Sequence, residues 1–187
     1  MSTVPWPDHL LTLAEWDALP ADDLRRYELF EGVLLVVPRP APRHQRAMVR
    51  LASELDRQLP DELTALADVE VVVDPGDPAT VRVPDVVVVA TARAEENPAR
   101  FSAGDVLLAV EIVSPGTGRT DRVTKLTEYA DAGIAHYWVL VLDEPVTLTA
   151  HTLVDGDFEV VAQGGGALAL ASPVPLVLDL EGLVRRR

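Results

Sequence analysis

The sequence predicts a mixed α/β fold: a central mixed sheet flanked by helices, with an N-terminal hairpin and C-terminal antiparallel strands. Three observations support this prediction. Apolar residues recur at helical spacing over residues 43–59. Runs rich in β-branched residues alternate with turns that contain glycine and proline. A strand–helix–strand pattern over 106–142 has the length of a crossover unit, whose two strands run parallel. We expect residues 1–187 to form a single domain.

The individual elements follow from capping residues, periodicity and turn signals. The segment from Thr12 to Glu15 has the form of a capping box, which predicts a short helix over 12–19 that ends at Pro20. The other expected elements are, in order, a hairpin over 27–37 around Gly32, a helix over 43–59, strands over 68–73, 81–89 and 106–113, a helix from about 120 to 132, a strand over 135–142, a hairpin formed by 146–153 and 158–162, and a short apolar segment over 175–183. Residues 91–104 and the glycines at 164–166 are expected to be connections.

Charge and composition exclude several classes of protein. The chain has 16 basic and 30 acidic side chains and a net charge of −14, which opposes indiscriminate binding of polyanions. It contains no cysteine, and therefore no disulfide framework or thiolate zinc site. No apolar segment is long enough to span a membrane, and the N-terminus lacks the pattern of a signal peptide. We therefore expect a soluble cytoplasmic protein. Lys125 is the only lysine of the chain.

Two carboxylates interrupt apolar strands. Asp85 begins the valine run 86–89, and Glu111 lies near the end of the strand over 106–113. A carboxylate in such a place is costly unless it is solvated, paired or bound to a cation. Two of them in adjacent strands would also repel each other, and a divalent cation would resolve both problems because Mg²⁺ prefers oxygen ligands.

The helix that follows the second carboxylate contributes a cation. Asp121, Lys125 and Tyr129 are four residues apart and share one helix face. A crossover helix packs back over the sheet that it has left, which can bring Lys125 above the end of Glu111's strand. A lysine there can stabilise the charge of a phosphate transition state or orient an attacking water.

These residues resemble a known family. The resemblance rests on Pro84-Asp85, on Glu111 through Pro115, on Asp121, Lys125 and Tyr129, on Tyr137-Trp138-Val139, and on the N-terminal segments 26–32 and 38–44. They look like the Uma2 family (DUF820), putative restriction endonucleases of the PD-(D/E)XK nuclease superfamily, over roughly residues 10 to 180. The superfamily usually has a lysine two residues after the second acid, where this chain has Val113. In Uma2-like proteins that lysine is taken to have moved to the following helix, which makes it Lys125.

The resemblance implies a restriction-endonuclease-like fold and Mg²⁺-dependent hydrolysis of phosphodiester bonds in DNA, with Mn²⁺ as a substitute. Asp85 and Glu111 would hold the metal together with the Ile112 carbonyl, and Lys125 would position the nucleophile. Supporting roles at the site fall to Glu28, Glu31, His44, Asp121 and Tyr129. Strand alternation places Glu28 and Glu31 on opposite faces, so only one of the two is expected to point inward.

The second helix has a stripe of arginines, Arg43, Arg46, Arg50 and Arg57. This stripe is the candidate contact for a DNA phosphate backbone, and the alternative is that it is only a solvated helix face. We expect a homodimer, since two-fold dimers are common, with residues 146–153 as a candidate interface.

Two other functions are compatible with the same residues. The first is a non-catalytic relative that keeps the fold and serves as an interaction module, which the valine at position 113 favours. The second is a metal-dependent hydrolase of a small phosphorylated or carboxylated substrate, which suits the overall acidity better than long duplex DNA does.

Overall fold

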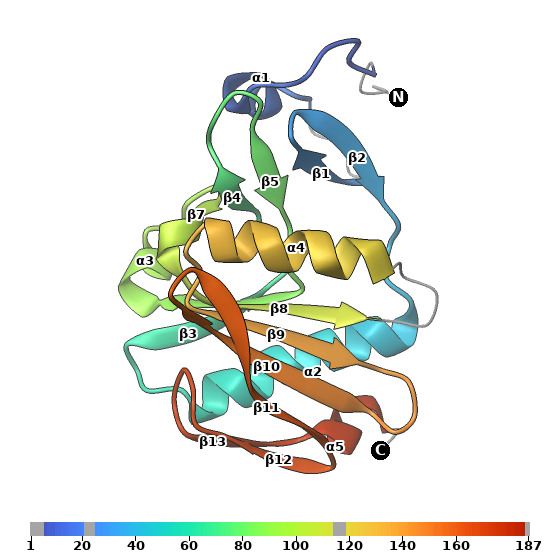
Figure 1. The fold of residues 1–187 in the computed structure, drawn as a ribbon, viewed down its shortest axis with the longest axis vertical. Helices are drawn as coiled ribbons and strands as arrows, with labels where there is room; N and C mark the ends of the chain where they lie inside the picture. Colours follow the sequence, from blue (N-terminus) through green and yellow to red (C-terminus); the bar gives the residue numbers. More distant parts are fainter. Residues whose placement is uncertain (1–5, 21–24, 114–118, 186–187) are drawn as a thin grey trace.

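A computed structural model describes residues 6–20, 25–113 and 119–185 and has the mixed α/β fold that the sequence predicts (Figure 1). The helices are α1 (Leu13–Asp17), α2 (Pro42–Gln58), α3 (Thr91–Glu95), α4 (Arg119–Asp131) and α5 (Leu180–Val184), with a 3-10 turn at Ala103–Asp105. The strands are β1 (Arg26–Phe30), β2 (Val33–Val37), β3 (Leu63–Ala67), β4 (Val71–Asp74), β5 (Thr80–Arg82), β6 (Val86–Ala90), β7 (Phe101–Ser102), β8 (Val106–Val113), β9 (His136–Val141), β10 (Thr147–Val154), β11 (Asp157–Gly165), β12 (Ala167–Leu170) and β13 (Leu176–Asp179).

The largest sheet is mixed and has the strand order β11-β10-β9-β8-β6-β3. Strands β8 and β9 run parallel and are connected through α4, which confirms the predicted crossover. The other pairs of this sheet are antiparallel. Buried side chains of α4 pack with one face of the sheet, and those of α2 and α5 pack with the other.

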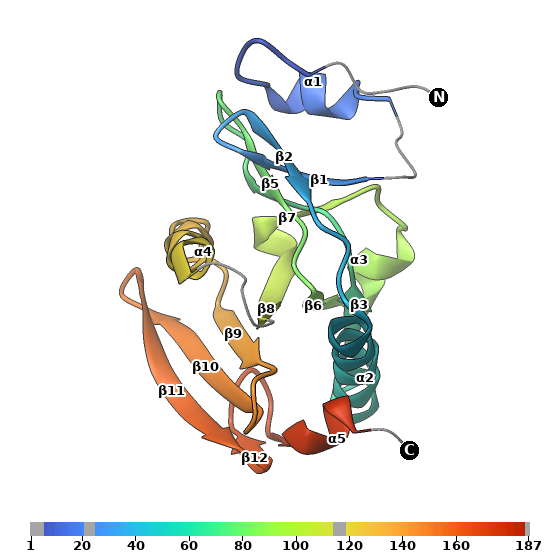
Figure 2. The same cartoon turned by 90° about the vertical axis from the view of Figure 1, so that its right-hand side faces the viewer.

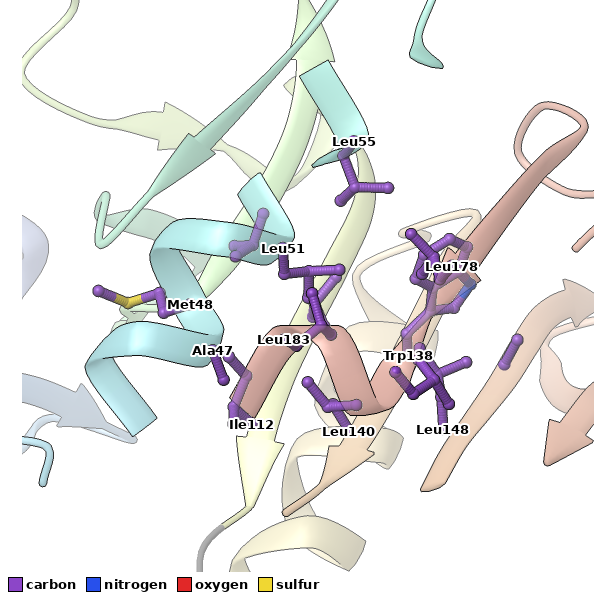
Figure 3. Close-up of a cluster of buried hydrophobic side chains, with 14 of the residues drawn as sticks. Ala47, Met48, Leu51, Leu55, Ile112, Trp138, Leu140, Leu148, Leu178 and Leu183 are labelled. Atoms are coloured by element: carbon purple, nitrogen blue, oxygen red, sulfur yellow. The ribbon is translucent and has the colours of Figure 1, made fainter. Parts of the chain in front are cut away.

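Helix α2 contributes the apolar face that its sequence predicts (Figure 3). Met48, Leu51 and Leu55 are buried against the sheet, and Ile112 of β8 belongs to the same cluster. Burying a leucine side chain contributes about 1.5–3 kcal/mol relative to leaving it exposed. This packing fixes the N-terminal turn of α2 close to the end of β8, where the candidate site lies.

A second sheet carries the N-terminal part of the chain, with the order β2-β1-β5-β4-β7. Figure 2 shows it above the larger sheet, with α1 at its outer end. Thr12 caps α1 through the predicted capping box. Gly32 has a φ of 76° in the β1–β2 turn, and a Cβ there would lie 2.7 Å from Leu10 Cβ, so both the backbone angle and the space require glycine.

The strand predicted over 81–89 is in fact two strands in two sheets. Strand β5 ends at Arg82 in the smaller sheet, and β6 begins at Val86 in the larger one. Pro84 lies at the break, where its missing N–H removes a ladder hydrogen bond. Asp85 is therefore the residue that precedes β6, rather than a position inside a continuous strand.

Other differences from the prediction lie in weakly patterned segments. Strand β3 was not predicted, and the expected connection over 91–104 contains α3 and β7. Gly164 and Gly165 pair with β10 as the end of β11, so they are not a joint. Strand β10 lies between β9 and β11, and Val146, Leu148 and Ala150 are fully buried. One face of the segment 146–153 therefore packs in the core, and its role as a dimer interface stays a prediction. Among the described helices, none has both the length and the apolar character needed to cross a membrane.

Candidate active site

The site lies where β6 begins and β8 ends. These strands are antiparallel neighbours with Val86 opposite Val110, so positions 85 and 111 face each other one step beyond the last registered pair. In Figure 1 the end of β8 and the start of α2 lie on the same side of the molecule, which Figure 2 turns towards the viewer. The topology therefore brings Asp85, Glu111 and the first turn of α2 together, as the sequence predicts for the two acids.

Asp85 is held by hydrogen bonds on both carboxylate oxygens. Its Oδ2 accepts the backbone N–H of Ile112 at 2.7 Å, and its Oδ1 lies 2.8 Å from Nε2 of His44. The residue is 5% exposed. His44 belongs to the first turns of α2, whose start at Pro42 is set by a residue with the fixed φ that helices prefer at this position. His44 is thus the supporting residue that orients the first carboxylate.

Glu111 meets two donors from α4. Its Oε1 accepts hydrogen bonds from Lys125 Nζ at 3.1 Å and from the Tyr129 hydroxyl at 2.9 Å. Burial raises the pKa of Glu111 to about 7, against the lowering effect of Lys125 and with further raising by the nearby carboxylates of Asp85 and Glu28. A carboxylate with a pKa near neutrality is typical of functional sites.

This raised pKa predicts a pH dependence of stability. Because the folded protein binds the Glu111 proton more tightly than the unfolded chain, stability falls as the pH rises from about 4.5 through about 7. From pH 5.5 to pH 8, wild type should lose about 2 kcal/mol of unfolding free energy that Glu111→Gln does not lose. Urea denaturation of both proteins in EDTA at the two pH values measures this difference. An equal effect of the substitution at the two pH values would contradict the prediction.

Lys125 is buried between two carboxylates. It is 6% exposed, and its Nζ lies 3.3 Å from Glu28 Oε1 in addition to its contact with Glu111. Tyr129, one turn later on α4, is fully buried, and burial together with Glu111 raises the pKa of its hydroxyl. The structure therefore places the only lysine of the chain, Tyr129 and Glu28 at the site.

A buried ion network lies behind Lys125, and two of its members were not predicted. Arg82 is 2% exposed and donates from Nη1 to Glu28 at 2.9 Å and from Nε and Nη2 to Glu128 of α4 at 2.8 and 2.6 Å. Its guanidinium also lies over the Phe30 ring, 4.9 Å from the centroid. Although burial opposes it, Lys125 and Arg82 hold the pKa of Glu28 below its usual value. The available signal was a lone arginine in the apolar run around β5.

One supporting candidate does not join this cluster, and the side chain of another lies outside the described residues. Glu31 is exposed in the β1–β2 turn, where its φ is 45° and its N–H bonds to Thr80 Oγ1 at 3.1 Å. The prediction that only one of Glu28 and Glu31 points inward is confirmed, and Glu28 is that residue. Asp121 lies in the first turn of α4, and its side chain is outside the described residues.

The arginine stripe of α2 is engaged within the chain. Arg46 and Arg50 donate to backbone carbonyls at the end of α5, including Gly182 O at 2.8 Å from Arg50 Nη1. Arg57 pairs with Glu54 of its own helix at 2.5 Å, and Arg43 lies 3.5 Å from Glu144. The stripe therefore fastens α5 and satisfies local carboxylates, and these contacts count against the predicted phosphate track.

The donor set near Asp85 suits a hard cation. In a strand the N–H and C=O of one residue point to the same side, so the Ile112 carbonyl faces the side from which its N–H reaches Asp85. Both contacts of Glu111 fall on Oε1, and each carboxylate oxygen has a second lone pair. Over the described residues there is no group of three or more His, Asp or Glu able to hold a metal. A cation here would take two carboxylates and one carbonyl and complete its shell with water and substrate, as Mg²⁺ commonly does.

The family of the chain follows from comparison with known proteins. The family model Uma2, described as "Putative restriction endonuclease", matches residues 13–181. The chain belongs to the Uma2 family. The resemblance drawn from its residues is thus confirmed.

A solved structure supports the Uma2 fold. A putative nuclease belonging to DUF820 from Anabaena variabilis ATCC 29413 is similar, with a TM-score of 0.71 and 22% sequence identity. The similarity covers 93% of this chain and 97% of that chain. At this identity the likeness shows the shared fold. No curated protein matches the sequence.

Proposed function

We propose that this Uma2 protein is a metal-dependent nuclease that hydrolyses phosphodiester bonds in DNA. One observation carries the proposal: the ammonium of Lys125 lies 3.1 Å from Glu111 at the end of β8, beside Asp85 at the start of β6. Two carboxylates and a buried cation suit chemistry on a phosphodiester, which needs both a cation site and a donor near the reacting group. DNA as the substrate follows from the description of the family.

Asp85, Glu111 and the Ile112 carbonyl would hold Mg²⁺, with Mn²⁺ as a substitute. When bound, such a cation neutralises charge on the phosphate and lowers the pKa of a coordinated water. The residues of the chain keep this donor set in place. His44 and the Ile112 N–H fix both oxygens of Asp85, and the Tyr129 hydroxyl fixes Oε1 of Glu111.

Lys125 is the donor that faces the reacting group in this proposal. Its ammonium donates to the carboxylates of Glu28 and Glu111, which hold it beside the candidate metal site. The same position lets it orient an attacking water or offset charge on a phosphate oxygen. Burial strengthens either effect, because charges interact more strongly away from bulk water.

The test compares metal binding and cleavage in matched variants. Mg²⁺ and Mn²⁺ are titrated by calorimetry into wild type, into Asp85→Asn/Glu111→Gln, and into the exposed control Asp143→Asn/Glu159→Gln. Plasmid and single-stranded DNA are incubated with the same samples. We expect wild type and control to bind metal and nick DNA, and the site variant to do neither.

Other outcomes select the alternatives. Metal binding with hydrolysis of a small phosphoester but no cleavage of DNA would support the small-substrate hydrolase. The absence of metal binding in wild type would overturn the catalytic proposal and leave an interaction module. A homodimer remains a prediction, and sedimentation equilibrium of the full chain tests it.

A further inference from the structure

A hollow of about 690 Å³ is lined in part by residues next to the candidate site in the chain or bonded to its backbone. Its lining comes from α1, β1, the β2–α2 connection and the segments before β4 and β7. Gln45, which follows the Asp85 partner His44, is part of this lining. So is Asp68, whose N–H donates to the Asp85 carbonyl at 3.2 Å. The hollow therefore borders two segments that contact Asp85, the start of α2 and the segment before β4.

Arginine is the commonest charged residue around this hollow. Its described lining contains Arg25, Arg26, Arg39 and Arg100, against the three carboxylates Asp17, Asp68 and Glu70. The whole chain, in contrast, has 16 basic and 30 acidic side chains. The described lining thus has a small excess of positive charge in a protein that is otherwise acidic.

The four arginines are of two kinds. Arg26 and Arg100 are held in place, because Arg26 pairs with Asp68 at 3.1 Å and Arg100 pairs with Asp17 and with Glu70. Arg25 and Arg39 are exposed. Four guanidinium groups around one hollow suit a ligand with several negative charges in a row, because guanidinium matches phosphate oxygens in pairs.

We propose that this hollow binds the phosphodiester backbone of the nucleic-acid strand that flanks the scissile phosphate. The inference rests on the proposed nuclease function and adds the path of the strand, which leaves the site past Asp85. It is an alternative to the α2 stripe, whose arginines bond to α5 carbonyls and to acids away from the candidate site. A size of several hundred Å³ accommodates a nucleotide-sized unit.

The test compares two pairs of exposed arginines that carry the same charge. Arg25→Gln/Arg39→Gln removes two cations at the hollow, and Arg43→Gln/Arg57→Gln removes two on the α2 stripe. Binding of a fluorescent DNA duplex is measured by anisotropy in EDTA over a series of NaCl concentrations. We expect the hollow pair to weaken binding at least tenfold and to reduce the salt slope by about 0.9 for each lost phosphate contact. The stripe pair should stay within twofold of wild type.

Hydrolysis separates this inference from the proposed function. Bis(p-nitrophenyl) phosphate is a phosphodiester without a flanking strand. With Mg²⁺, the hollow pair should lose at least tenfold in kcat/KM on the duplex and stay within twofold on this small diester. If wild type cleaves DNA and the two double variants bind DNA equally well, the proposed role of the hollow is wrong and the proposed nuclease function stands. If wild type neither binds nor cleaves DNA, both proposals fail.

Discussion

Replacing Lys125 with methionine is expected to lower the rate of DNA cleavage about 10²–10³-fold, the loss that follows removal of one well-placed donor at a transition state. Methionine keeps the length and the apolar stem of lysine and removes only the ammonium that contacts Glu111 and Glu28. Single-turnover cleavage at saturating metal measures the effect on the reaction itself.

The pH of this experiment matters because Lys125 also lowers the pKa of Glu111. Without the ammonium, Glu111 holds its proton to a higher pH, which weakens cation binding near neutrality. Measurement at pH 8.5 with excess Mg²⁺ fills the metal site and isolates the lost donor. Arg57→Met is the control, because it also removes one cation but from an exposed helix position. A Lys125→Met rate within threefold of this control would contradict the assigned role.

The two acids were predictable because each breaks a local rule. Asp85 and Glu111 stand alone in apolar runs, where an unpaired carboxylate is costly, and the antiparallel pairing of β6 with β8 brings them together. Lys125 followed from helical spacing after Glu111. Each of these inferences uses residues that are neighbours in sequence or that lie at the ends of elements with strong patterns.

The network behind Lys125 was not predictable in the same way. Arg82 contacts Glu28, which is 54 residues earlier, and Glu128, which is 46 residues later, and the three belong to β1, β5 and α4. No periodicity connects positions at such distances. Their proximity depends on the break at Pro84, which places β5 in the smaller sheet and β6 in the larger one. The valine-rich run over 81–89 gives no sign of this break.

Strand β3 and the partners of two α2 arginines also depend on contacts between residues far apart in the sequence. Strand β3 has the sequence LTALA, in which only threonine favours strands. The strand forms because it pairs with the edge of β6. The partners of Arg46 and Arg50 on α2 were also not predictable, because the carbonyls that these arginines bind lie more than 130 residues away, at the end of α5. Tertiary partners decided each of these cases.

Replacing Arg82 with methionine is expected to lower the unfolding free energy by about 3–5 kcal/mol at pH 7, the usual cost of leaving buried carboxylates without their cation. The substitution removes three hydrogen bonds to Glu28 and Glu128 but keeps an apolar side chain of similar size over the Phe30 ring. Urea denaturation followed by circular dichroism measures the loss.

The pH dependence identifies the cause of the loss. The pKa of Glu28 is held below its usual value by Lys125 and Arg82, so its favourable interactions act above about pH 4.5 and disappear as the pH falls below that value. The deficit of Arg82→Met should therefore be larger at pH 7 than at pH 4, where Glu28 without Arg82 accepts a proton. A loss of packing alone would be equal at both pH values and would contradict this explanation.

Two further variants connect the network to the site. Arg57→Met breaks an exposed pair with Glu54 and should leave the unfolding midpoint nearly unchanged, as surface ion pairs contribute little. Arg82→Met/Glu128→Gln removes both sides of the contact between β5 and α4 and should recover part of the stability, since one buried charge no longer lacks a partner. If the double variant recovers stability but still cleaves DNA slowly, the ion pair positions α4 and its Lys125. Equal recovery of stability and cleavage would limit Arg82 to a structural role.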